Sequence, residues 1–94
     1  MIAKTFLVRN NTALSCFELD ADGATAVANY RLAHGAITFT HTEVPPALRE
    51  RGIGSRLVQG ALEHARAQGV KVVPRCPFVR TYIAEHPEFQ NLLA

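Results

Sequence analysis

Alternating apolar and polar positions dominate the first half of the chain. Three runs show the period of two that is typical of a half-buried β-strand, namely residues 13–20, 24–32 and 36–44. Asp22-Gly23 and His34-Gly35 separate these runs and supply residues that tight hairpin turns favour. The pattern therefore predicts three antiparallel strands in series, and residues 5–9 predict a short additional edge strand.

A helical period replaces this alternation after Pro45-Pro46, because neither proline can donate a hydrogen bond to a neighbouring strand. From Arg51 to Gln68 apolar residues recur at helical spacing, and Gly69 follows where a C-terminal cap is expected. A short apolar run at 70–74 then predicts a buried strand. Strand, helix and strand form a crossover unit, so the strands at 36–44 and 70–74 are predicted to be parallel neighbours.

A second helix is predicted near the end of the chain. Pro77 favours the first helical position, which makes Cys76 the N-cap residue, and His86-Pro87 ends the helix. Its apolar stripe consists of Phe78, Tyr82 and Ile83. The predicted fold class is therefore α/β, in its α+β form: a three-strand antiparallel meander, a helical crossover to a parallel fourth strand, and a C-terminal helix.

Composition is consistent with one small globular domain over residues 1–94. Hydrophobic residues make up 48% of the chain and charged residues 19%, which excludes a disordered or collagen-like protein. The first ten residues lack the apolar core of a signal peptide, and two cysteines are too few for a disulfide framework. We therefore expect a cytoplasmic protein. No spacing of histidines and cysteines predicts a metal site.

The charge of the chain is small but unevenly distributed. A net charge of +2 does not favour nucleic acid or an anionic membrane as a partner. Arg49, Arg51 and Arg56, however, lie within eight residues, and they flank the glycines of RERGIG (49–54) at the start of the predicted helix. Glycine-rich backbone at a helix N-terminus binds anions, because its N–H groups are free and the helix dipole is positive there. The third glycine of the dinucleotide fingerprint and the Gly-Lys-Ser/Thr of a Walker loop are both missing.

RERGIG fits the form Arg/Gln-x-x-Gly-x-Gly/Ala, and on this motif the chain resembles the GCN5-related N-acetyltransferases. The segments THTEVPPALRERGIGSRL and VVPRCPFVRTYIAEHPEF extend the resemblance to small single-domain members with a cysteine in the active-site region, from about Val8 to Leu93. The resemblance implies acetyl-coenzyme A as co-substrate and no metal. It also implies that backbone groups of Thr42 to Val44 pair with the pantetheine arm and that the amides of residues 51–55 hold the pyrophosphate. The implied coenzyme-binding residues are Thr42, Val44, Arg49, Arg51, Gly52, Ile53, Gly54, Ser55 and Arg56.

Three residues are candidates for the chemistry of acetyl transfer: Cys76, His41 and Glu43. His41 and Glu43 share one face of the third strand, and Cys76 follows the neighbouring parallel strand, so we expect the three side chains to gather at one crevice. The N-cap position favours the thiolate of Cys76, which is either an acetyl carrier or a helix cap. His41 is either a base near neutral pH or a partly buried strand residue, and Glu43 orients it, acts as the base itself or faces solvent. Cys16 is expected in the core.

The sequence therefore predicts an acetyl-coenzyme A-dependent N-acyltransferase that acts on a small amine or on an amine of a peptide or protein, directly or through Cys76. The alternative is a coenzyme A-binding or protein-interaction module without efficient transfer. That alternative arises because the larger acetyltransferases bind the acceptor with additional helices, for which this chain leaves no room between its first strands. We expect a monomer or a small homo-oligomer, with neither nucleic acid nor a membrane as partner.

Overall fold

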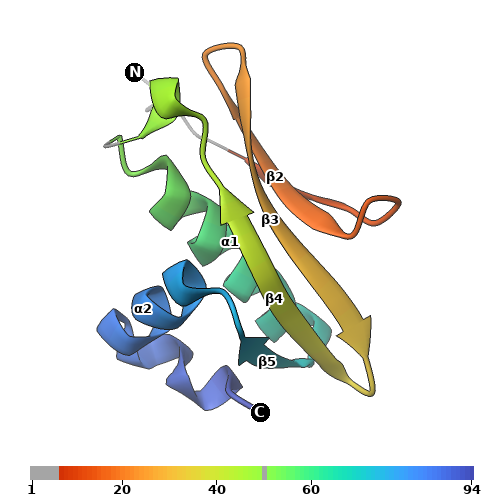
Figure 1. Cartoon of the computed structure of the whole chain (residues 1–94). Helices are drawn as coiled ribbons and strands as arrows, with labels where there is room; N and C mark the ends of the chain where they lie inside the picture. Colours follow the sequence, from red (N-terminus) through yellow and green to blue (C-terminus); the bar gives the residue numbers. More distant parts are fainter. Residues whose placement is uncertain (1–6, 50) are drawn as a thin grey trace, which may run out of the picture.

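The computed structural model describes residues 7–49 and 51–94, and a mixed β-sheet forms its centre (Figure 1). Within the described residues the sheet has five strands in the order β1-β2-β3-β4-β5. The strands are β1 (Val8–Asn11), β2 (Cys16–Ala21), β3 (Ala24–Ala33), β4 (Ala36–Glu43) and β5 (Lys71–Pro74). Strands β1 to β4 are antiparallel, and β4 and β5 are parallel. The predicted α/β class, meander and crossover are therefore confirmed.

The bounds of the first two strands differ from the prediction. The edge strand β1 covers Val8–Asn11 rather than 5–9, and residues 5 and 6 of that prediction lie outside the described residues. The second strand begins at Cys16 rather than at residue 13. The reason is a turn, in which the Leu14 N–H donates to the Asn11 carbonyl at 3.2 Å and Ser15 has a φ of 51°. A left-handed residue cannot continue an extended strand.

A β-bulge interrupts the pairing of β3 with β4. Tyr30 pairs with Phe39, but the preceding Asn29 pairs with His41, so Thr40 is the extra residue of the bulge. Side chains alternate along a strand, and one extra residue reverses which face each following side chain occupies. Because Phe39 faces the core, unbroken alternation would also turn His41 inward. The bulge turns Thr42 inward instead.

Two α-helices follow the meander. Helix α1 (Ile53–Gln68) starts two residues later than predicted, because Gly52 has a φ of 72° and forms the N-cap. Gly69 caps its other end, also with a φ of 72°, as the sequence predicted. Helix α2 (Pro77–Glu85) has Cys76 at its N-cap, as predicted. Two short 3-10 helices, η1 (Pro46–Leu48) and η2 (Pro87–Leu92), were not predicted.

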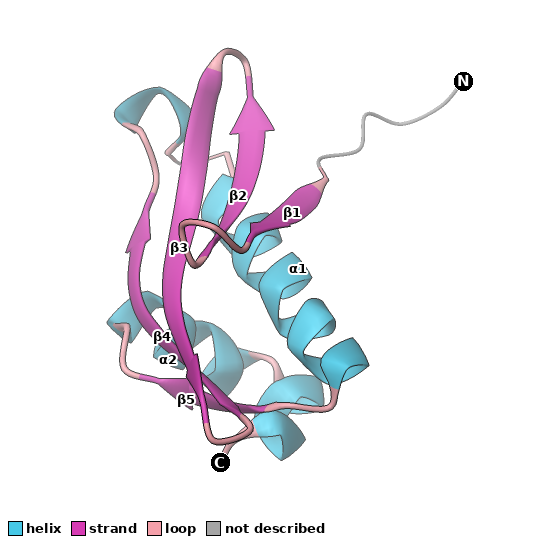
Figure 2. Ribbon diagram, turned by 90° about the vertical axis from the view of Figure 1, so that its right-hand side faces the viewer, coloured by secondary structure: helices cyan, strands magenta, loops and turns pink. Residues whose placement is uncertain are grey.

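The core lies between one face of the sheet and the helices, and α1 runs along that face (Figure 2). Phe17 and Phe39 of the sheet pack in the same cluster as Leu57 and Leu62 of α1 and Val79 of α2. All five side chains are almost completely buried. Complete burial of such a side chain contributes about 1.5–3 kcal/mol, so this packing holds α1 and α2 against the sheet.

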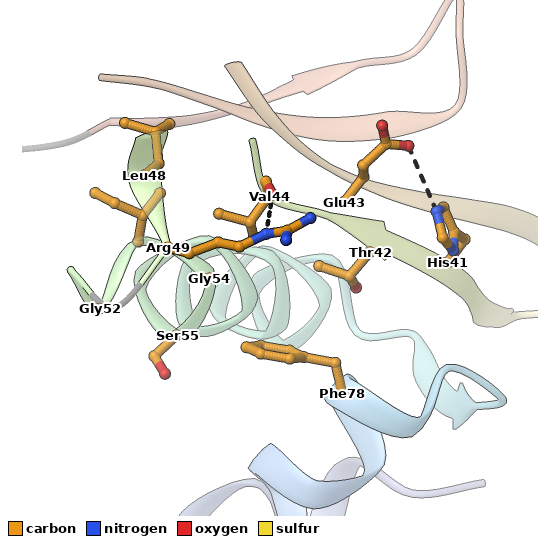
Figure 3. Close-up of a pocket in the computed structure, with 11 residues that line it drawn as sticks. His41, Thr42, Glu43, Val44, Leu48, Arg49, Gly52, Gly54, Ser55 and Phe78 are labelled. Atoms are coloured by element: carbon orange, nitrogen blue, oxygen red, sulfur yellow. Dashed lines mark hydrogen bonds and ion pairs between the residues drawn. The ribbon is translucent and has the colours of Figure 1, made fainter. Parts of the chain in front are cut away.

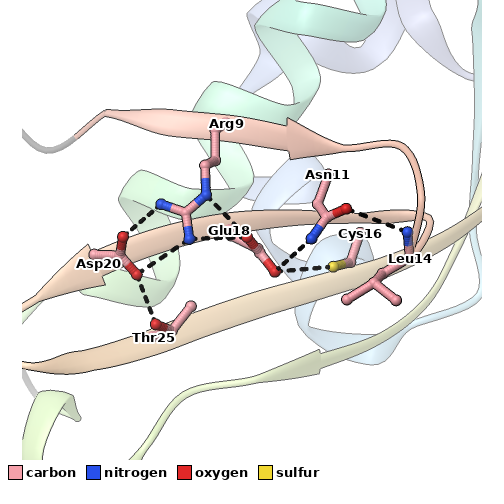
Figure 4. Close-up of polar contacts among 7 residues, drawn as sticks. All are labelled: Arg9, Asn11, Leu14, Cys16, Glu18, Asp20 and Thr25. Atoms are coloured by element: carbon pink, nitrogen blue, oxygen red, sulfur yellow. Dashed lines mark hydrogen bonds and ion pairs between the residues drawn. The ribbon is translucent and has the colours of Figure 1, made fainter.

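Cys16 lies outside this core cluster, although it is buried. Its Sγ donates to Glu18 Oε2 at 3.6 Å, and the same carboxylate accepts from Asn11 at 3.2 Å and from Arg9 at 2.9 Å (Figure 4). Arg9 also pairs with Asp20 at 2.5 Å. The expectation that Cys16 belongs to the core was therefore correct for its burial and wrong for its surroundings. This polar cluster ties the edge strand β1 to β2.

Candidate functional site

A cavity of about 680 Å³ lies where β4 ends and α1 begins (Figure 3). The predicted site residues that line it are His41, Thr42, Glu43, Val44, Arg49, Gly52, Ile53, Gly54 and Ser55. Leu48 and Phe78 also line it, although the sequence analysis did not select them as site residues. Cys76, Arg51 and Arg56 do not belong to its lining.

The cavity exists because β4 extends further than its parallel partner. The β4–β5 ladder ends at the pair Phe39 and Pro74, and the last backbone contact is the Cys76 N–H donating to the Phe39 carbonyl at 2.9 Å. Beyond this point β4 continues to Glu43 while the chain after β5 turns into α2. The edge of β4 that faces away from β3 is therefore not covered by β5, and its backbone groups are accessible to a ligand.

The N-terminus of α1 forms another wall. The first helical hydrogen bond runs from the Arg56 N–H to the Gly52 carbonyl at 3.1 Å. The amides of Ile53, Gly54 and Ser55 therefore precede the helical ladder, and their N–H groups with the positive end of the helix dipole favour an anion. A side chain at Gly54 would be crowded, because its Cβ would lie 2.8 Å from Phe78 Cζ and 3.3 Å from Val44 Cγ2.

The three arginines of the motif region have different surroundings. Arg49 lines the cavity, and its Nε donates to the Val44 carbonyl at 3.0 Å (Figure 3). Arg51 instead forms an ion pair with Asp22 of the β2–β3 turn at 2.5 Å. Arg56 lies in the first turn of α1, outside the cavity lining. Arg49 is therefore the arginine whose side chain is placed to meet a ligand in the cavity.

His41 and Glu43 form a pair on the outward face of β4. His41 Nε2 lies 3.5 Å from Glu43 Oε2, and the two side chains are 64% and 69% exposed. Both line the cavity, and Figure 3 shows them directed away from α2. The reading of His41 as a partly buried strand residue is therefore wrong. With Nε2 facing the carboxylate, Nδ1 remains as a proton acceptor in the neutral ring.

Cys76 is not brought together with this pair. Its Sγ lies 3.3 Å from Thr42 Oγ1 on the inward face of β4, and the residue is only 4% exposed. The bulge at Thr40 is the physical reason, because it turns Thr42 toward Cys76 and His41 away. The sequence analysis assumed unbroken alternation and therefore expected all three candidate side chains at one crevice.

The environment of Cys76 has opposing effects on its thiol. Burial raises the pKa of Cys76. Hydrogen bonds from the Thr42 hydroxyl and from the backbone N–H groups of Val79 and Phe78 lower it by more, so the pKa lies below its ordinary value. The predicted direction of the shift is confirmed.

Phe78 and Leu48 are the lining residues that sequence reasoning missed. Phe78 was assigned to the packing stripe of the second helix, but it is 43% exposed and its ring covers Gly54. Leu48 follows Pro45-Pro46 in the 3-10 turn η1 and is 1% exposed. The signal that was available for Phe78 is its place directly after the Cys76-Pro77 cap, which points the first turn of α2 at the end of β4.

The described parts of the chain contain no group of three or more histidine, cysteine or acidic side chains that could hold a metal ion. None of the helices formed by residues 7–49 and 51–94 is long and apolar enough to cross a membrane.

A mixed sheet, a crossover helix with glycines at its N-terminus and a cavity at that point define a protein of the α/β class with a candidate anion-binding site. The family model described as GCN5-related N-acetyl-transferase matches residues 16–92. The chain therefore belongs to the GCN5-related N-acetyltransferase family.

The chain is similar to named proteins over 60% of its length and to a solved structure over 94% of its length. Protein NATD1 of Gallus gallus and of Mus musculus are each 36% identical over 56 residues, which is 60% of this chain and 51% of each relative. The matched segment thus spans about half the length of these relatives. The solution structure of a GCN5-like protein from Staphylococcus aureus has a TM-score of 0.71 and 24% identity, over 94% of this chain and 87% of that one. This similarity establishes the shared fold.

Proposed function

We propose that the protein transfers an acetyl group from acetyl-coenzyme A to an amine acceptor. The observation that carries the proposal is the N-terminus of α1, where Gly52 and Gly54 line a cavity beside the uncovered edge of β4. This arrangement offers amides for a pyrophosphate and a backbone edge for a chain of amides such as pantetheine. Membership of the N-acetyltransferase family supports the same co-substrate.

The coenzyme would lie along two walls of the cavity. The amides of residues 51–55 would hold the pyrophosphate, and backbone groups of Thr42 to Val44 would pair with the pantetheine arm. Arg49 would supply charge-assisted donors, because its guanidinium already contacts the end of β4 through the Val44 carbonyl. Arg51 and Arg56 would contribute through their backbone and through longer-range attraction, since their side chains lie outside the cavity lining.

Direct attack by the acceptor is the transfer route that the exposed pair supports. The amine nitrogen forms a bond to the thioester carbonyl carbon, and the carbon–sulfur bond breaks. The proton lost by the amine passes to His41, which Glu43 orients at 3.5 Å, and the coenzyme A thiolate takes up a proton from water. Both residues face solvent, so an acceptor can reach them without passing through the core.

A covalent route through Cys76 is the second possibility, and the lowered pKa of its thiol favours it. In this route the thiolate forms an acetyl thioester and releases coenzyme A, and the amine then takes the acetyl group and restores the thiol. Burial opposes it, because the Cys76 side chain is 4% exposed and does not line the cavity. We therefore assign Cys76 a positioning role at the start of α2.

A coenzyme A-binding module without efficient transfer is the competing function. The described chain passes from β1 through β2 and β3 to β4 without an intervening helix, which would leave the acceptor side open and shallow. We further propose that residues 1–94 act as one domain, as a cytoplasmic monomer or small homo-oligomer, without nucleic acid or membrane partners.

Turnover separates the two functions. The purified protein is incubated with acetyl-coenzyme A and a panel of polyamines, amino acids and lysine peptides, and release of the coenzyme A thiol is followed. Acetyltransferase activity predicts thiol release that depends on at least one amine, with acetylated amine as the product. Saturable binding of acetyl-coenzyme A without release for any amine would favour the binding module.

A further inference from the structure

An exposed arginine lies beside the His41–Glu43 pair on the outward face of the sheet. Tyr30 of β3 is buried in the core, so its neighbours Asn29 and Arg31 face outward. Asn29 pairs with His41, which places Arg31 diagonally across the β3–β4 ladder from that histidine. Arg31 is therefore a neighbour of the residue that we propose as the general base.

The distance between the two positions suits an arginine. Arg31 pairs with Thr38, and His41 follows Thr38 by three residues, because the bulge adds one. Diagonal neighbours in a regular antiparallel pair are about 7–8 Å apart, which long side chains span. The guanidinium of Arg31 can thus reach a ligand that also contacts the ring of His41.

The charges of the outward face differ in whether they are paired. The acidic residues of β2 are paired with Arg9 of β1, and Glu43 is paired with His41. Arg31 is exposed, and its side chain forms no hydrogen bond or ion pair with any residue that the structure describes. The positive charge of Arg31 is therefore available to an anionic group of a ligand.

We propose that the acceptor is an α-amino acid, with its amine at His41 and its carboxylate at Arg31, an inference that rests on the proposed function. A guanidinium binds a carboxylate through two parallel N–H···O bonds, which fix the orientation of the ligand. In an α-amino acid the amine and the carboxylate are bonded to the same carbon, so two side chains on neighbouring strands can contact both groups. The product is an N-acetyl amino acid.

Glu43 determines in which direction such a zwitterion lies. Along the outward face, His41 lies between Arg31 and Glu43. The Glu43 carboxylate attracts an ammonium group and repels a carboxylate, whereas Arg31 does the reverse. The ammonium releases one proton to water, and the neutral amine forms its bond to the thioester carbon while the carbon–sulfur bond breaks. His41 takes the second proton of the amine, and the coenzyme A thiolate takes up a proton from water.

Polyamines and lysine side chains fit this arrangement less well. Neither carries a carboxylate beside the reacting amine, so Arg31 would have no group to bind. The further ammonium groups of a polyamine would also be repelled by Arg31. The charge of the outward face therefore favours an amino acid over both.

A pair of acceptors that differ only in the carboxylate tests the proposal. The value of kcat/KM for acetylation is measured for phenylalanine and for 2-phenylethylamine, with wild type and with Arg31→Gln. The substitution should lower the ratio of the phenylalanine value to the 2-phenylethylamine value about tenfold or more, mainly by raising the KM for phenylalanine. The different basicities of the two amines cancel, because the same pair is compared in both proteins. Alanine with ethylamine and leucine with isoamylamine repeat the comparison for smaller side chains.

Two further variants sharpen the result. Arg31→Lys should restore part of the ratio, because lysine keeps the charge but lacks the planar fork of the guanidinium. Lys71→Gln is the matched control, since it removes one positive charge from an exposed residue that pairs with Ala36 at the far end of β4. It should leave the ratio unchanged. A loss of folded protein does not alter the ratio, because both amines are measured on the same sample.

The failures of the two proposals are distinguishable. If amines are acetylated but wild type and Arg31→Gln have the same ratio, the amino acid assignment is wrong and the proposed function stands. The same conclusion follows if polyamines or lysine peptides react and no amino acid does. If no amine is acetylated, the proposed function is wrong and the amino acid assignment fails with it.

Discussion

The two faces of β4 carry different chemistry on neighbouring residues. The outward face has His41 and Glu43, which are mostly exposed and 3.5 Å apart. The inward face has Thr42, whose hydroxyl lies 3.3 Å from the buried sulfur of Cys76. Exposure favours the outward pair as the groups that meet an acceptor, and the lowered pKa of the thiol favours the inward pair as a nucleophile.

A single extra residue produces this division. The bulge at Thr40 reverses the alternation of β4 just before the cavity. His41 and Glu43 therefore face outward and Thr42 faces inward, whereas unbroken alternation would give the opposite arrangement. On the proposed function, the acceptor and the coenzyme would approach the end of β4 from different faces.

The largest effect is expected on the outward face. His41→Ala should lower kcat/KM for acetyl transfer about 100-fold or more, because it removes the proposed general base. Affinity for acetyl-coenzyme A should change little, since we assign His41 no contact with the phosphates. Steady-state kinetics and calorimetry measure the two quantities. His34→Asn is the matched control, because His34 lies in the β3–β4 turn with a φ of 55° that asparagine tolerates. Equal activity of His41→Ala and wild type would remove the pair from the mechanism.

A smaller effect is expected on the inward face. Cys76→Ala should retain acetyl transfer within about tenfold of wild type, because direct attack needs no acetyl carrier. Wild-type protein mixed with acetyl-coenzyme A and no acceptor should gain no hydroxylamine-labile acetyl mass. Mass spectrometry and turnover check both statements. An acetyl adduct that Cys76→Ala abolishes and Cys16→Ala preserves, together with lost turnover in Cys76→Ala, would establish the covalent route instead.

The smallest effect is a difference in titration between two equally buried cysteines. Cys16 is 3% exposed and Cys76 is 4% exposed. Burial raises the pKa of the Cys16 thiol, and the Glu18 carboxylate raises it further, whereas the pKa of Cys76 is lowered. Thiolate absorbance should therefore titrate at lower pH in Cys16→Ala, which reports Cys76, than in Cys76→Ala, which reports Cys16. Adding Thr42→Val to Cys16→Ala should raise the midpoint, and adding Thr40→Val should not.

The direction of each pKa shift also determines how the free energy of unfolding depends on pH through that thiol. A lowered folded-state pKa means that the native protein releases its proton first, so the contribution of Cys76 is present above the unfolded pKa and is lost as pH falls through the folded value. The contribution of Cys16 has the opposite sign, because its folded pKa is raised. It is present below the unfolded pKa and is lost as pH rises through the folded value. Midpoints that coincide in the two single-cysteine variants would contradict both assignments.

Local sequence signals were sufficient for the crossover and located the start of α1 to within two residues. Periodicity identifies the amphipathic helix, and Gly52 supplies a left-handed N-cap with a φ of 72° that other residues rarely adopt. Pro77 likewise fixes the start of α2. These features depend on residues that are close in the sequence, which is why pattern analysis located the glycine loop next to the end of β4.

The missed features depend on contacts between distant segments. Arg51 was grouped with the anion site, but it pairs with Asp22 across the β2–β3 turn. The bulge at Thr40 arises in the pairing of β3 with β4 and has no glycine or proline to mark it. Phe78 lies at a helical spacing that is typical of packing residues. Only the position of α1 shows that its ring lies over Gly54. Tertiary pairing decides each of these cases.

Binding of acetyl-coenzyme A at the N-terminus of α1 is the central claim, and thermal unfolding tests it most directly. Ligand at 100 times its Kd should stabilise the native state by about 2.7 kcal/mol and raise the Tm by roughly ten degrees. Gly54→Val should remove most of this shift, measured against its own unliganded Tm, because the new side chain would displace Phe78 and Val44 at the cavity wall. Gly35→Asn, in a turn with open space around its Cβ, should preserve the shift. An unchanged Tm of the wild-type protein at millimolar acetyl-coenzyme A would contradict the account.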